Sequence, residues 1–565
     1  MAKKISGQEY EAWSKDELIK EIVKIKSTTY GLVWHRDLPE EKIDILINPD
    51  ARTPNEMFPN EMAGEPFPVL KEVKSKAIES DKSKLVNLLI EGDNYHSLAV
   101  LNFTHNEAID LIYIDPPYNT GNNDFIYNDK FVDKEDSFRH SKWLSFMEKR
   151  LKLAKNLLKS SGAIFISIDE NEYAPLRMLC DEVFDEKNFV ANLIWKSKSG
   201  GANDSKFFAV DHEYILVYAK NSENLKLNLD TEAVVTTSYN LEDENGKYSL
   251  DRLDKQSLGY LVSLDFPIKG PDGKVYTVFH KDPKNKIARW RWGAKTVKER
   301  FSELVFKNGC VYTKNYEKDG AIPRSLLTDE RFGRTRTGKT ELFDLFGKEV
   351  FQNPKPSKLI KYIISLVGTK NSTVLDFMAG SGTTANAVLS MNKEDGGKRN
   401  FILCTNNGDE KSEHKIASDV CYPRVKKIMS GYKSQKGEKI VGSGGNLKYY
   451  KTDFVEAEPT DKNKRKLVKE STDMLCILEN AFELIQETPE FKIYKNTDKY
   501  VGVIFYEDAI EDYKKAIKKI DGHFNTYVFS MGDDPHTKKF ADIKNKVTLC
   551  AIPEVIMKVY RVIFK

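Results

Sequence analysis

The sequence predicts an α/β protein with a doubly wound parallel sheet, and three observations lead to this fold class. Four short apolar runs, rich in Ile, Val, Leu and Tyr, lie close to polar or turn residues: Leu85–Ile90, Ile109–Ile114, Ala163–Ile168 and Tyr214–Tyr218. Residues Trp143–Leu158, between the second and third runs, carry apolar side chains at the three- and four-residue spacing of a helix. The same alternation of strand and helix resumes after residue 350, so we expect two halves of one sheet.

The second half of the expected sheet is as regular as the first. An amphipathic helix is predicted over Lys358–Leu366 and a strand over Thr373–Phe377. A helix then extends to Met391, and a last strand covers Asn400–Thr405. In such sheets ligands bind at the carboxyl ends of the strands. Three acidic residues follow the first three apolar runs and are expected there: Asp93, Asp115 and Asp169.

Composition changes along the chain divide its 565 residues into six segments. Residues 1–84 are charged and are expected to form a helical arm, in which Ser14–Glu17 resembles a capping box that opens a helix reaching Ile25. Residues 221–350 mix turn signals with basic and aromatic residues, which indicates an inserted domain of another class. The remaining segments are the two halves of the core at 85–220 and 351–430, a linker rich in Gly, Ser and Lys at 431–446, and a small α+β domain at 447–565.

Overall composition excludes few functions. A net charge of +3 from 88 basic and 85 acidic residues leaves nucleic-acid binding open, because binding needs only a local basic face. The six cysteines form no CxxC pair, and no histidine is spaced to complete a zinc site, so we expect free thiols and no metal. No apolar run approaches the roughly 20 residues that span a bilayer, and the N-terminus lacks a secretory signal. We therefore expect a cytoplasmic protein that binds no membrane.

The first motif is Leu375–Thr384, in which a strand enters a glycine turn and a helix leaves it. Gly380 and Gly382 permit positive φ angles and close approach of a ligand to the backbone. The N-terminus of the following helix favours a carboxylate or a phosphate. No Gly-Lys-Ser/Thr follows, so the motif is not a P-loop. Taken alone, it is equally compatible with a tight turn that binds nothing.

The second motif is Asp115-Pro116-Pro117-Tyr118, directly after an apolar strand. The two prolines rigidify the exit from the strand and remove two backbone donors. The carboxylate of Asp115 and the carbonyl of Pro116 can each accept one hydrogen of a flat amine, while Tyr118 stacks on its ring. Acceptance of both hydrogens favours a more tetrahedral nitrogen whose lone pair points at a methyl donor. A purely structural turn is the alternative for these four residues alone.

Together the two motifs resemble the catalytic and cofactor motifs of DNA amino-methyltransferases, and their order resembles the β class. The wider sequence resembles most closely the modification (Mod) subunit of type III restriction-modification systems. The segments that carry the resemblance are Leu89–Tyr95, Tyr113–Gly121, Phe125–Asn128, Asn353–Ser357, Tyr422–Arg424 and Asn446–Tyr450. The resemblance covers nearly the whole chain and is loosest over 221–350. It implies a Rossmann-like methyltransferase sheet and methylation of adenine N6.

The resemblance also implies a role for each motif residue. Asp115, Pro116, Pro117 and Tyr118 would hold an adenine flipped out of the duplex, because N6 cannot meet the methyl donor inside the stack. The methionine part of S-adenosylmethionine would lie against Asp376, Phe377, Gly380 and Gly382, with Ser381 and Thr383 in the same loop. Asp93 would contact the cofactor adenine, and Lys355 would lie near the cofactor carboxylate. Many methyltransferases carry an acidic ribose-binding residue after the next strand, whereas this chain has Asn406 there.

The partners implied by the resemblance are double-stranded DNA, a second copy of the chain and a restriction (Res) subunit. Residues 221–350 would read the target in the major groove, and Arg289–Trp292 within them suits either DNA contact or a strand with a packed tryptophan. Three alternatives stay open. A cytosine-N4 enzyme would use the same hydrogen bonds, although Asp115 resembles the adenine enzymes. A catalytically silent recognition scaffold would not need both motifs, and a nicotinamide-binding enzyme would need a third glycine.

Overall fold

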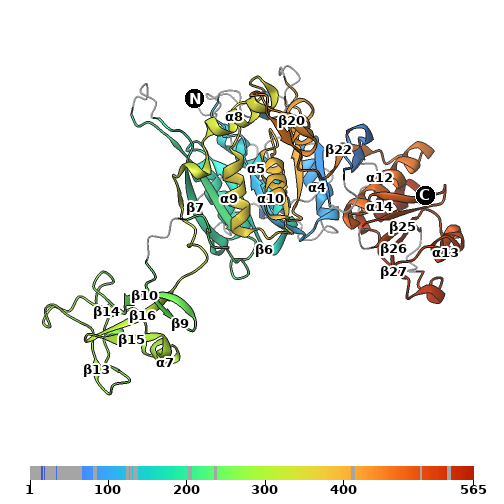
Figure 1. Ribbon diagram of the computed structural model, residues 1–565. Helices are drawn as coiled ribbons and strands as arrows, with labels where there is room; N and C mark the ends of the chain where they lie inside the picture. The colour runs from blue at the N-terminus through green and yellow to red at the C-terminus, as the bar shows by residue number, and fades with distance from the viewer. Residues whose placement is uncertain are drawn as a thin grey trace. The chain divides into compact units, whose positions relative to one another are not determined.

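The structure is a computed structural model that describes residues 14–16, 18–19, 34, 66–80, 85–121, 126–127, 130–131, 138–200, 207–233, 238–408, 414–496, 499–530 and 536–564 (Figure 1). The helix expected from Ser14 to Ile25 lies largely outside these residues. None of the helices in these parts of the chain is both long and apolar enough to span a membrane. The chain forms two compact units, one of residues 1–227 with 324–565 and one of residues 228–323.

A ten-stranded sheet forms the centre of the first unit, in the order β1-β22-β2-β19-β18-β3-β6-β8-β7-β17. Its strands are β1 (Phe67–Glu72), β22 (Asn446–Val455), β2 (Val86–Glu91), β19 (Asn400–Thr405), β18 (Thr373–Asp376), β3 (Ile109–Ile114), β6 (Leu158–Ile168), β8 (His212–Ala219), β7 (Phe189–Lys196) and β17 (Leu326–Leu327). The six strands from β22 to β6 are mutually parallel. Strand β8 is antiparallel to both of its neighbours. The prediction of an α/β protein with a large, mostly parallel sheet is therefore confirmed.

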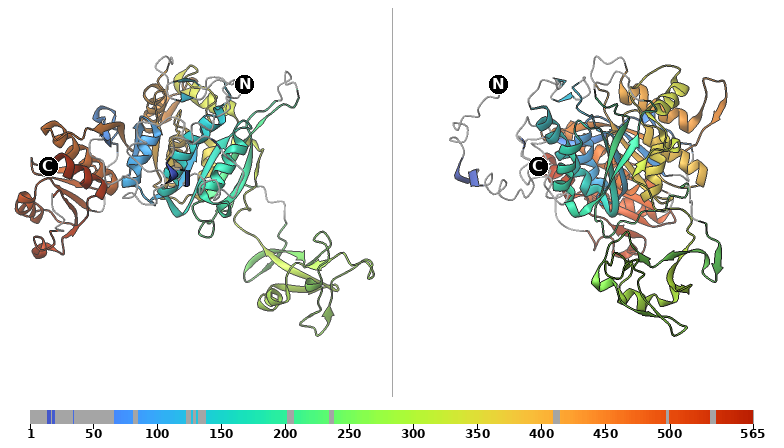
Figure 2. Two further views of the ribbon diagram at one scale, coloured as in Figure 1. Left: turned by 180° about the vertical axis from the view of Figure 1, so that it is seen from behind. Right: turned by 90° about the vertical axis from the view of Figure 1, so that its left-hand side faces the viewer.

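Helices cover both faces of this sheet, because its central strands are apolar on both sides. In β3, Ile112 and Ile114 belong to one core, and Leu111 and Tyr113 belong to the other. The first core includes side chains of α4 (Asn94–Thr104), α5 (Arg139–Leu157) and α6 (Tyr173–Phe184). The second includes side chains of α9 (Ser357–Val367), α10 (Thr383–Asp395) and α11 (Tyr422–Ser430). The right-hand view of Figure 2 shows the two helical layers on either side of the sheet.

The sequence located most central strands within a residue or two. Strands β3 and β19 have the predicted bounds, and β18 ends one residue earlier than expected, at Asp376. Strand β6 begins at Leu158, five residues before the predicted start, because its first residues continue directly from the end of α5. These strands are set by local apolar runs, which explains why the sequence pattern finds them.

Two predicted boundaries are corrected at the edge of the sheet. Strand β1 lies inside the segment expected to be a helical arm, and it pairs antiparallel with β22. Strand β22 in turn pairs parallel with β2. The sequence predicts the residues of β22 in the linker and the C-terminal domain, outside the sheet. Both strands owe their conformation to pairing with segments more than 350 residues away in sequence, which a local pattern cannot reveal.

The predicted linker at 431–446 is also corrected, because it contains a hairpin of β20 (Gly431–Lys433) and β21 (Lys439–Val441). Gly431 has a φ of +87°, and a Cβ atom there would lie 2.7 Å from the carbonyl oxygen of Ile440. The glycine and serine content of this stretch therefore reflects tight backbone packing instead of a free tether.

The C-terminal part of the chain forms a five-stranded sheet in the order β23-β24-β25-β26-β27. The strands are Glu483–Glu487, Phe491–Lys495, Tyr500–Ile504, Phe524–Val528 and Val547–Leu549, with helices α12 (Asp461–Glu479), α13 (Ile510–Lys518) and α14 (Glu554–Phe564). Side chains of α12, among them Leu467 and Met474, share one apolar core with β1 and α4. This sheet is therefore joined to the main one through α12.

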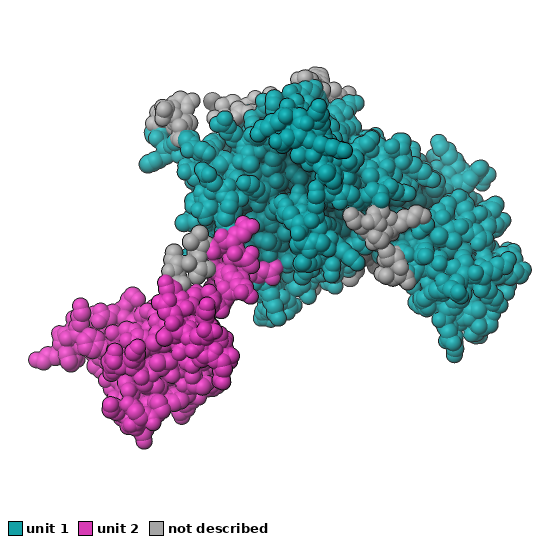
Figure 3. Space-filling view, in the orientation of Figure 1, with its two compact units in different colours: residues 1–227, 324–565 teal, residues 228–323 magenta. Residues whose placement is uncertain are grey.

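Residues 228–323 form the second unit, which is coloured separately in Figure 3. It has a four-stranded sheet in the order β15 (Leu304–Lys307), β16 (Cys310–Tyr316), β10 (Gly246–Arg252) and β9 (Leu241–Asp243), and an apolar core of its own that includes the buried Trp290. The insertion is shorter than the expected 221–350, because β17 and α8 (Thr335–Phe346) belong to the first unit. Backbone hydrogen bonds in both directions between Asp230 and Ala321, 2.8 and 3.0 Å long, hold its two ends together.

Because these ends are hydrogen-bonded to each other, we expect that replacing residues 231–320 with a short Gly/Ser linker leaves the first unit folded. Cooperative thermal unfolding, followed by circular dichroism, checks this expectation. The matched control is the longer excision of 221–350, which also removes β17 and Glu341. It should destabilise the protein strongly, since Glu341 pairs with the fully buried Arg424. Aggregation of the shorter excision, with the control no worse, would contradict the assignment.

Candidate active site

The turn Asp115–Tyr118 leaves the carboxyl end of β3 in a fixed conformation. The indole Nε1 of Trp143 donates a 2.7 Å hydrogen bond to the carbonyl oxygen of Pro117. Trp143 lies on α5 and its side chain is fully buried, so the core of the domain holds the turn directly. The next residue, Asn119, has a φ of +55°, a left-handed conformation that asparagine tolerates better than most residues. The prolines and these contacts fix where the carboxylate of Asp115 lies.

Four polar side chains meet beside this turn and form what we call the lysine cluster: Asp115, Tyr118, Glu213 and Lys355. The Nζ of Lys355 donates to both carboxylate oxygens of Asp115, at 2.7 and 2.8 Å, and to the hydroxyl of Tyr118, at 2.9 Å. It lies 3.3 Å from Oε2 of Glu213. The Tyr118 hydroxyl lies 3.0 Å from Oδ1 of Asp115 and 2.8 Å from Oε2 of Glu213. One ammonium therefore serves two carboxylates and a phenol.

Burial and charge set the protonation states in the lysine cluster. Burial raises the pKa of Asp115, although Lys355 acts against this. Burial lowers the pKa of Lys355, but the charges of Asp115 and Glu213 more than offset it and hold this pKa above its ordinary value. Burial and the same two carboxylates raise the pKa of Tyr118 well above its ordinary value. Near neutral pH, Lys355 is thus a cation and Tyr118 a neutral phenol.

The lysine cluster contains one residue that sequence reasoning missed, Glu213, and one contact that it did not predict, between Lys355 and Asp115. Glu213 is the second residue of β8, and β8 runs antiparallel to β6 with Tyr214 opposite Ile168. Its beginning therefore lies at the edge where the parallel strands end, but only knowledge of the strand direction could reveal this. Lys355, expected near a cofactor carboxylate, directs its amine at the carboxylate of Asp115.

The glycine loop begins on β18, the strand next to β3, so the two motifs lie side by side. Asp376 ends this strand; its Oδ2 accepts a 2.6 Å hydrogen bond from the hydroxyl of Thr384, and its Oδ1 accepts one from the amide of Met378. Burial raises the pKa of Asp376 to about 7, against these two hydrogen bonds, and the charge of Asp115 adds to the effect. Phe377, next along the chain, is fully buried.

The two glycines of the loop cannot readily be replaced by larger residues. Gly380 has a φ of +48°, and a Cβ atom there would lie 3.0 Å from the ring of Phe351. Gly382 has a φ of +79°, and a Cβ atom there would lie 3.0 Å from Sγ of Cys421. Gly382 is also the N-cap of α10, whose first backbone amides point toward the loop. A backbone cradle at a helix N-terminus, beside a buried carboxylate, fits a ligand with a charged amino-acid portion.

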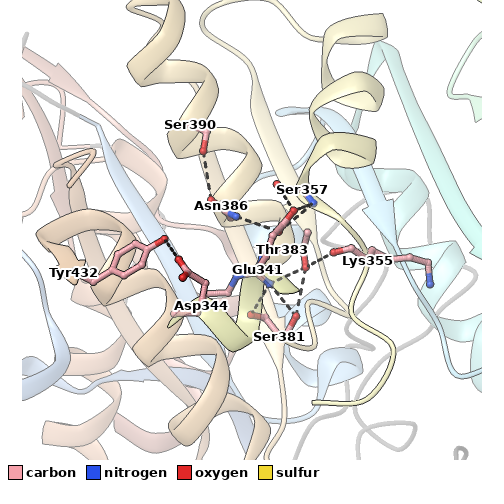
Figure 4. Close-up of polar contacts among 10 residues, drawn as sticks. Glu341, Asp344, Lys355, Ser357, Ser381, Thr383, Asn386, Ser390 and Tyr432 are labelled. Atoms are coloured by element: carbon pink, nitrogen blue, oxygen red, sulfur yellow. Dashed lines mark hydrogen bonds and ion pairs between the residues drawn. The ribbon is translucent and has the colours of Figure 1, made fainter. Parts of the chain in front are cut away.

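The hydroxyls of Ser381 and Thr383 point into the protein, as Figure 4 shows. Arg424, which is fully buried, donates from Nη1 to Ser381 Oγ at 3.0 Å and to Thr383 Oγ1 at 2.9 Å. Its Nη2 lies 3.1 Å from Oε2 of Glu341 on α8, and Thr383 also donates to the carbonyl oxygen of Lys355 at 3.2 Å. The two hydroxyls therefore hold the glycine loop against Arg424, and the hydroxyl of Thr383 connects the loop to the backbone of Lys355.

Asp93 lies where the sequence predicts, at the carboxyl edge beside the glycine loop. Its Oδ1 caps α4 by accepting from the amides of Tyr95 and His96, at 2.7 and 3.2 Å. The neighbouring Asn94 donates to the carbonyl oxygen of Phe377 at 3.1 Å, which brings the two segments together. About half of the Asp93 side chain (54%) remains exposed, so it can still accept a hydrogen bond from a ligand.

In the second unit, Trp290 and Arg291 of the arginine–tryptophan segment make contacts within the protein. Trp290 is buried and donates from Nε1 to the carbonyl oxygen of Phe266 at 2.7 Å. Arg291 pairs with Asp251 at 3.0 Å and donates to Thr313 at 2.6 Å. Arg289 and Trp290 form the short strand β14 (Arg289–Trp290), in which the tryptophan is packed, and Arg291 follows it.

Comparison with known proteins assigns this combination of fold and motifs to a family. A family model described as DNA methylase matches residues 109–417, more than half of the chain. The chain is 38% identical over 356 residues to the StyLTI Mod subunit, a type III restriction-modification enzyme of Salmonella typhimurium, and this match covers 56% of the chain and 52% of that relative. It is 35% identical over 377 residues to the type II methyltransferase M.KpnI of Klebsiella pneumoniae, covering 62% of the chain and 89% of that relative.

The chain thus matches about half the length of the type III relative and most of the type II one. Among solved structures, the cytosine-N4-specific PvuII DNA methyltransferase is similar with a TM-score of 0.31 and 14% identity, covering 61% of the chain and 95% of that structure.

The lysine cluster predicts a specific instability when its cation is removed. Lys355→Met would leave two largely buried carboxylates without a counter-charge, so we expect a loss of roughly 3–5 kcal/mol in the free energy of unfolding at pH 7, measured with urea. Burial already raises the pKa of Asp115 against the effect of Lys355, so without the cation Asp115 binds a proton more tightly in the folded than in the unfolded state. The deficit should therefore shrink as the pH falls.

The matched control is Lys361→Met, which removes a lysine paired with the largely exposed Glu394. This variant should lose no more than about 1 kcal/mol. Equal losses in the two variants, or a deficit at Lys355 that does not change with pH, would show that the cluster is not an ion pair of this kind.

Proposed function

The chain belongs to the DNA methylase family, and we propose that it transfers the methyl group of S-adenosylmethionine to N6 of an adenine in double-stranded DNA. The observation that carries this proposal is the position of the Asp115–Tyr118 turn and the glycine loop on the adjacent parallel strands β3 and β18. A rigid acceptor of amine hydrogens thus lies next to a backbone cradle. Neither the turn nor the loop alone would support the assignment.

The proposed roles at the base follow from the donors and acceptors of the turn. Asp115 and the carbonyl of Pro116 accept the two amine hydrogens, Pro117 keeps the turn rigid through Trp143, and Tyr118 stacks on the flipped base. Acceptance of both hydrogens raises electron density on a nitrogen that is otherwise a poor nucleophile. Lys355 stabilises the carboxylate form of Asp115, which is the form that can accept hydrogen bonds.

The proposed cofactor site surrounds the glycine loop. Its residues are Asp376, Phe377, Gly380, Ser381, Gly382 and Thr383, with Asp93 for the cofactor adenine. The backbone of the loop and the N-terminus of α10 would hold the amino-acid end, while Ser381 and Thr383 keep the loop in shape through Arg424. When bound, the cofactor supplies a methyl group on a positively charged sulfur. Lys355, which the family resemblance places near the cofactor carboxylate, donates its amine hydrogens to Asp115 in the structure and so lies between the proposed base and cofactor sites.

We further propose that the chain is the modification and recognition subunit of a type III restriction-modification system, supported by its similarity to the StyLTI Mod subunit. In this proposal residues 228–323 read the DNA target, and the chain acts in the cytoplasm as a homodimer with a Res subunit. Loss of site preference in the variant that lacks residues 231–320, with cofactor affinity kept, would support the recognition role.

The experiment that tests the function uses methyl-labelled S-adenosylmethionine, plasmid DNA grown without methylation and digestion to nucleosides. We expect the label in N6-methyladenine. Label in N4-methylcytosine would keep the chemistry and change the base. Cofactor binding without any transfer would favour a silent recognition scaffold.

The carboxylate of Asp115 is the group that the reaction should need most. In Asp115→Ala we expect kcat to fall by more than about 100-fold, because the main acceptor of the amine hydrogens is lost. DNA affinity, measured by fluorescence anisotropy, should change little. The matched control is Asp169→Asn, a carboxylate at the end of the neighbouring strand β6 that binds Asn171 and lies outside the lysine cluster. Transfer by Asp115→Ala at the rate of this control would refute the role.

The glycine loop makes a separate prediction about cofactor affinity. Gly382→Asp should abolish binding of S-adenosylhomocysteine in calorimetry, because it adds both bulk and negative charge to the cradle. The control Gly396→Asp sits at the other end of α10, with a similar φ of +68° and no atom within 4 Å of its Cβ position. It should carry similar backbone strain and bind normally. Loss of affinity in both variants would point to strain alone.

A further inference from the structure

The hydroxyl of Tyr118 lies between two carboxylates, Asp115 at 3.0 Å and Glu213 at 2.8 Å. A phenol can accept a hydrogen bond and donate one at the same time. Lys355 donates to its oxygen, and its single proton can point at either carboxylate. The family motif gives Tyr118 the role of stacking on the base, which leaves both the hydroxyl contact and Glu213 without a function.

The proposed methylation creates a need that this arrangement can meet. An amine that gains a methyl group must lose one proton, and Asp115 is the carboxylate placed to take it. The Asp115 side chain keeps 28% exposure to water, and an amine that hydrogen-bonds to this carboxylate would cover part of that surface. With the base bound, the direct route for a proton from Asp115 to water is therefore narrower, and a second route is useful. Lys355 cannot take it, since the pKa of this ammonium is held above its ordinary value and it keeps its protons.

We propose that Glu213 is a positioning residue that receives the proton released by methyl transfer, passed from Asp115 through the hydroxyl of Tyr118. This inference rests on the function proposed above and deepens it. Glu213 is suited to the role because its Oε2 accepts a hydrogen bond from the Tyr118 hydroxyl. It lies on β8, and Asp115 follows a different strand, β3. Its side chain keeps 16% exposure to water.

The steps balance as follows. The nitrogen forms a bond to the methyl carbon as the sulfur–carbon bond of the sulfonium donor breaks, and the bonding pair stays on sulfur. One N–H bond breaks and an O–H bond forms on Asp115. That proton then moves to the oxygen of Tyr118 while the phenolic proton moves to Oε2 of Glu213. Tyr118 is neutral before and after, and Glu213 releases the proton to water.

Lys355 permits transfer of the proton between the two carboxylates without taking part in it. Its ammonium touches both carboxylates, so it lowers the repulsion between them and stabilises whichever of the two is charged. Since the cation stays in place, the proton can move from one carboxylate to the other with little change in the net charge of the lysine cluster. Without the cation, the two buried carboxylates would repel each other when both are charged, and the proton would be held tightly between them.

A double-mutant cycle tests the relay, with kcat measured on unmethylated plasmid DNA. Tyr118→Phe keeps the ring and removes the hydroxyl, and Glu213→Gln keeps the shape and removes the acceptor. We expect each to lower kcat by roughly 100-fold, the double variant to be no slower than the slower single, and Glu213→Asp to recover part of the loss. Independent, multiplicative losses would overturn the relay, as would full activity of Glu213→Gln.

A pH profile separates this role from a merely structural one. The charge of Glu213 raises the pKa of Asp115, so Glu213→Gln should shift the acidic limb of the kcat profile to lower pH. Damage to the fold alone would leave the limb where it is. The control is Glu170→Gln, an exposed carboxylate next to the same sheet edge, which should keep both kcat and the limb.

Two further readouts complete the test. Affinity for S-adenosylhomocysteine should be the same in all variants, and loss of it in Glu213→Gln would assign the residue to the cofactor site and reject the relay. A wild-type chain that binds DNA and S-adenosylhomocysteine but transfers no methyl group would refute the proposed function, and the relay with it. Active wild-type protein with an active Glu213→Gln variant would refute the relay alone.

Discussion

The geometry of the site depends on one buried ammonium. The amine of Lys355 has to be neutralised because burial of an unpaired cation is costly, and the two carboxylates that neutralise it come from different strands. A buried ion pair of this kind adds little net stability, since desolvation offsets the attraction, but it penalises every arrangement in which one partner is misplaced. The ion pairs thereby hold three parts of the chain in one relative position: the end of β3, the beginning of β8 and the segment before α9.

A second buried cation extends the same constraint to the glycine loop. Arg424 is fully buried and holds Ser381 and Thr383 from one side, while Thr383 donates to the backbone of Lys355 on the other. The lysine cluster and the loop are therefore linked by consecutive hydrogen bonds. A shift of the loop would therefore disturb the Asp115–Tyr118 turn, and this coupling gives the domain a pre-organised centre instead of two independent motifs.

The sequence was sufficient wherever the determining interactions are local. Local patterns of about ten residues were enough to find strands β3 and β19 and both motifs. These patterns are an apolar run, a pair of prolines and a pair of glycines. Strands β1 and β22 could not be assigned, because distant partners impose their conformation. Glu213 was missed for the same reason: only the antiparallel direction of β8 brings it to the site. The ion pair of Lys355 with Asp115 was not expected either, since the order of residues along the chain does not show which carboxylate a lysine 240 residues away will reach.

The separation of the two halves of the core also has a consequence for synthesis. Asp115 and Lys355 are 240 residues apart, with residues 228–323 between them. At about 5–20 residues per second, roughly 10–50 s pass on the ribosome after the turn is made and before its lysine exists. During this time β3 lacks its neighbour β18, which leaves an open strand edge on an apolar sheet. The lysine cluster therefore cannot assemble until late in translation, and until then the edge of β3 stays open to pairing with another chain.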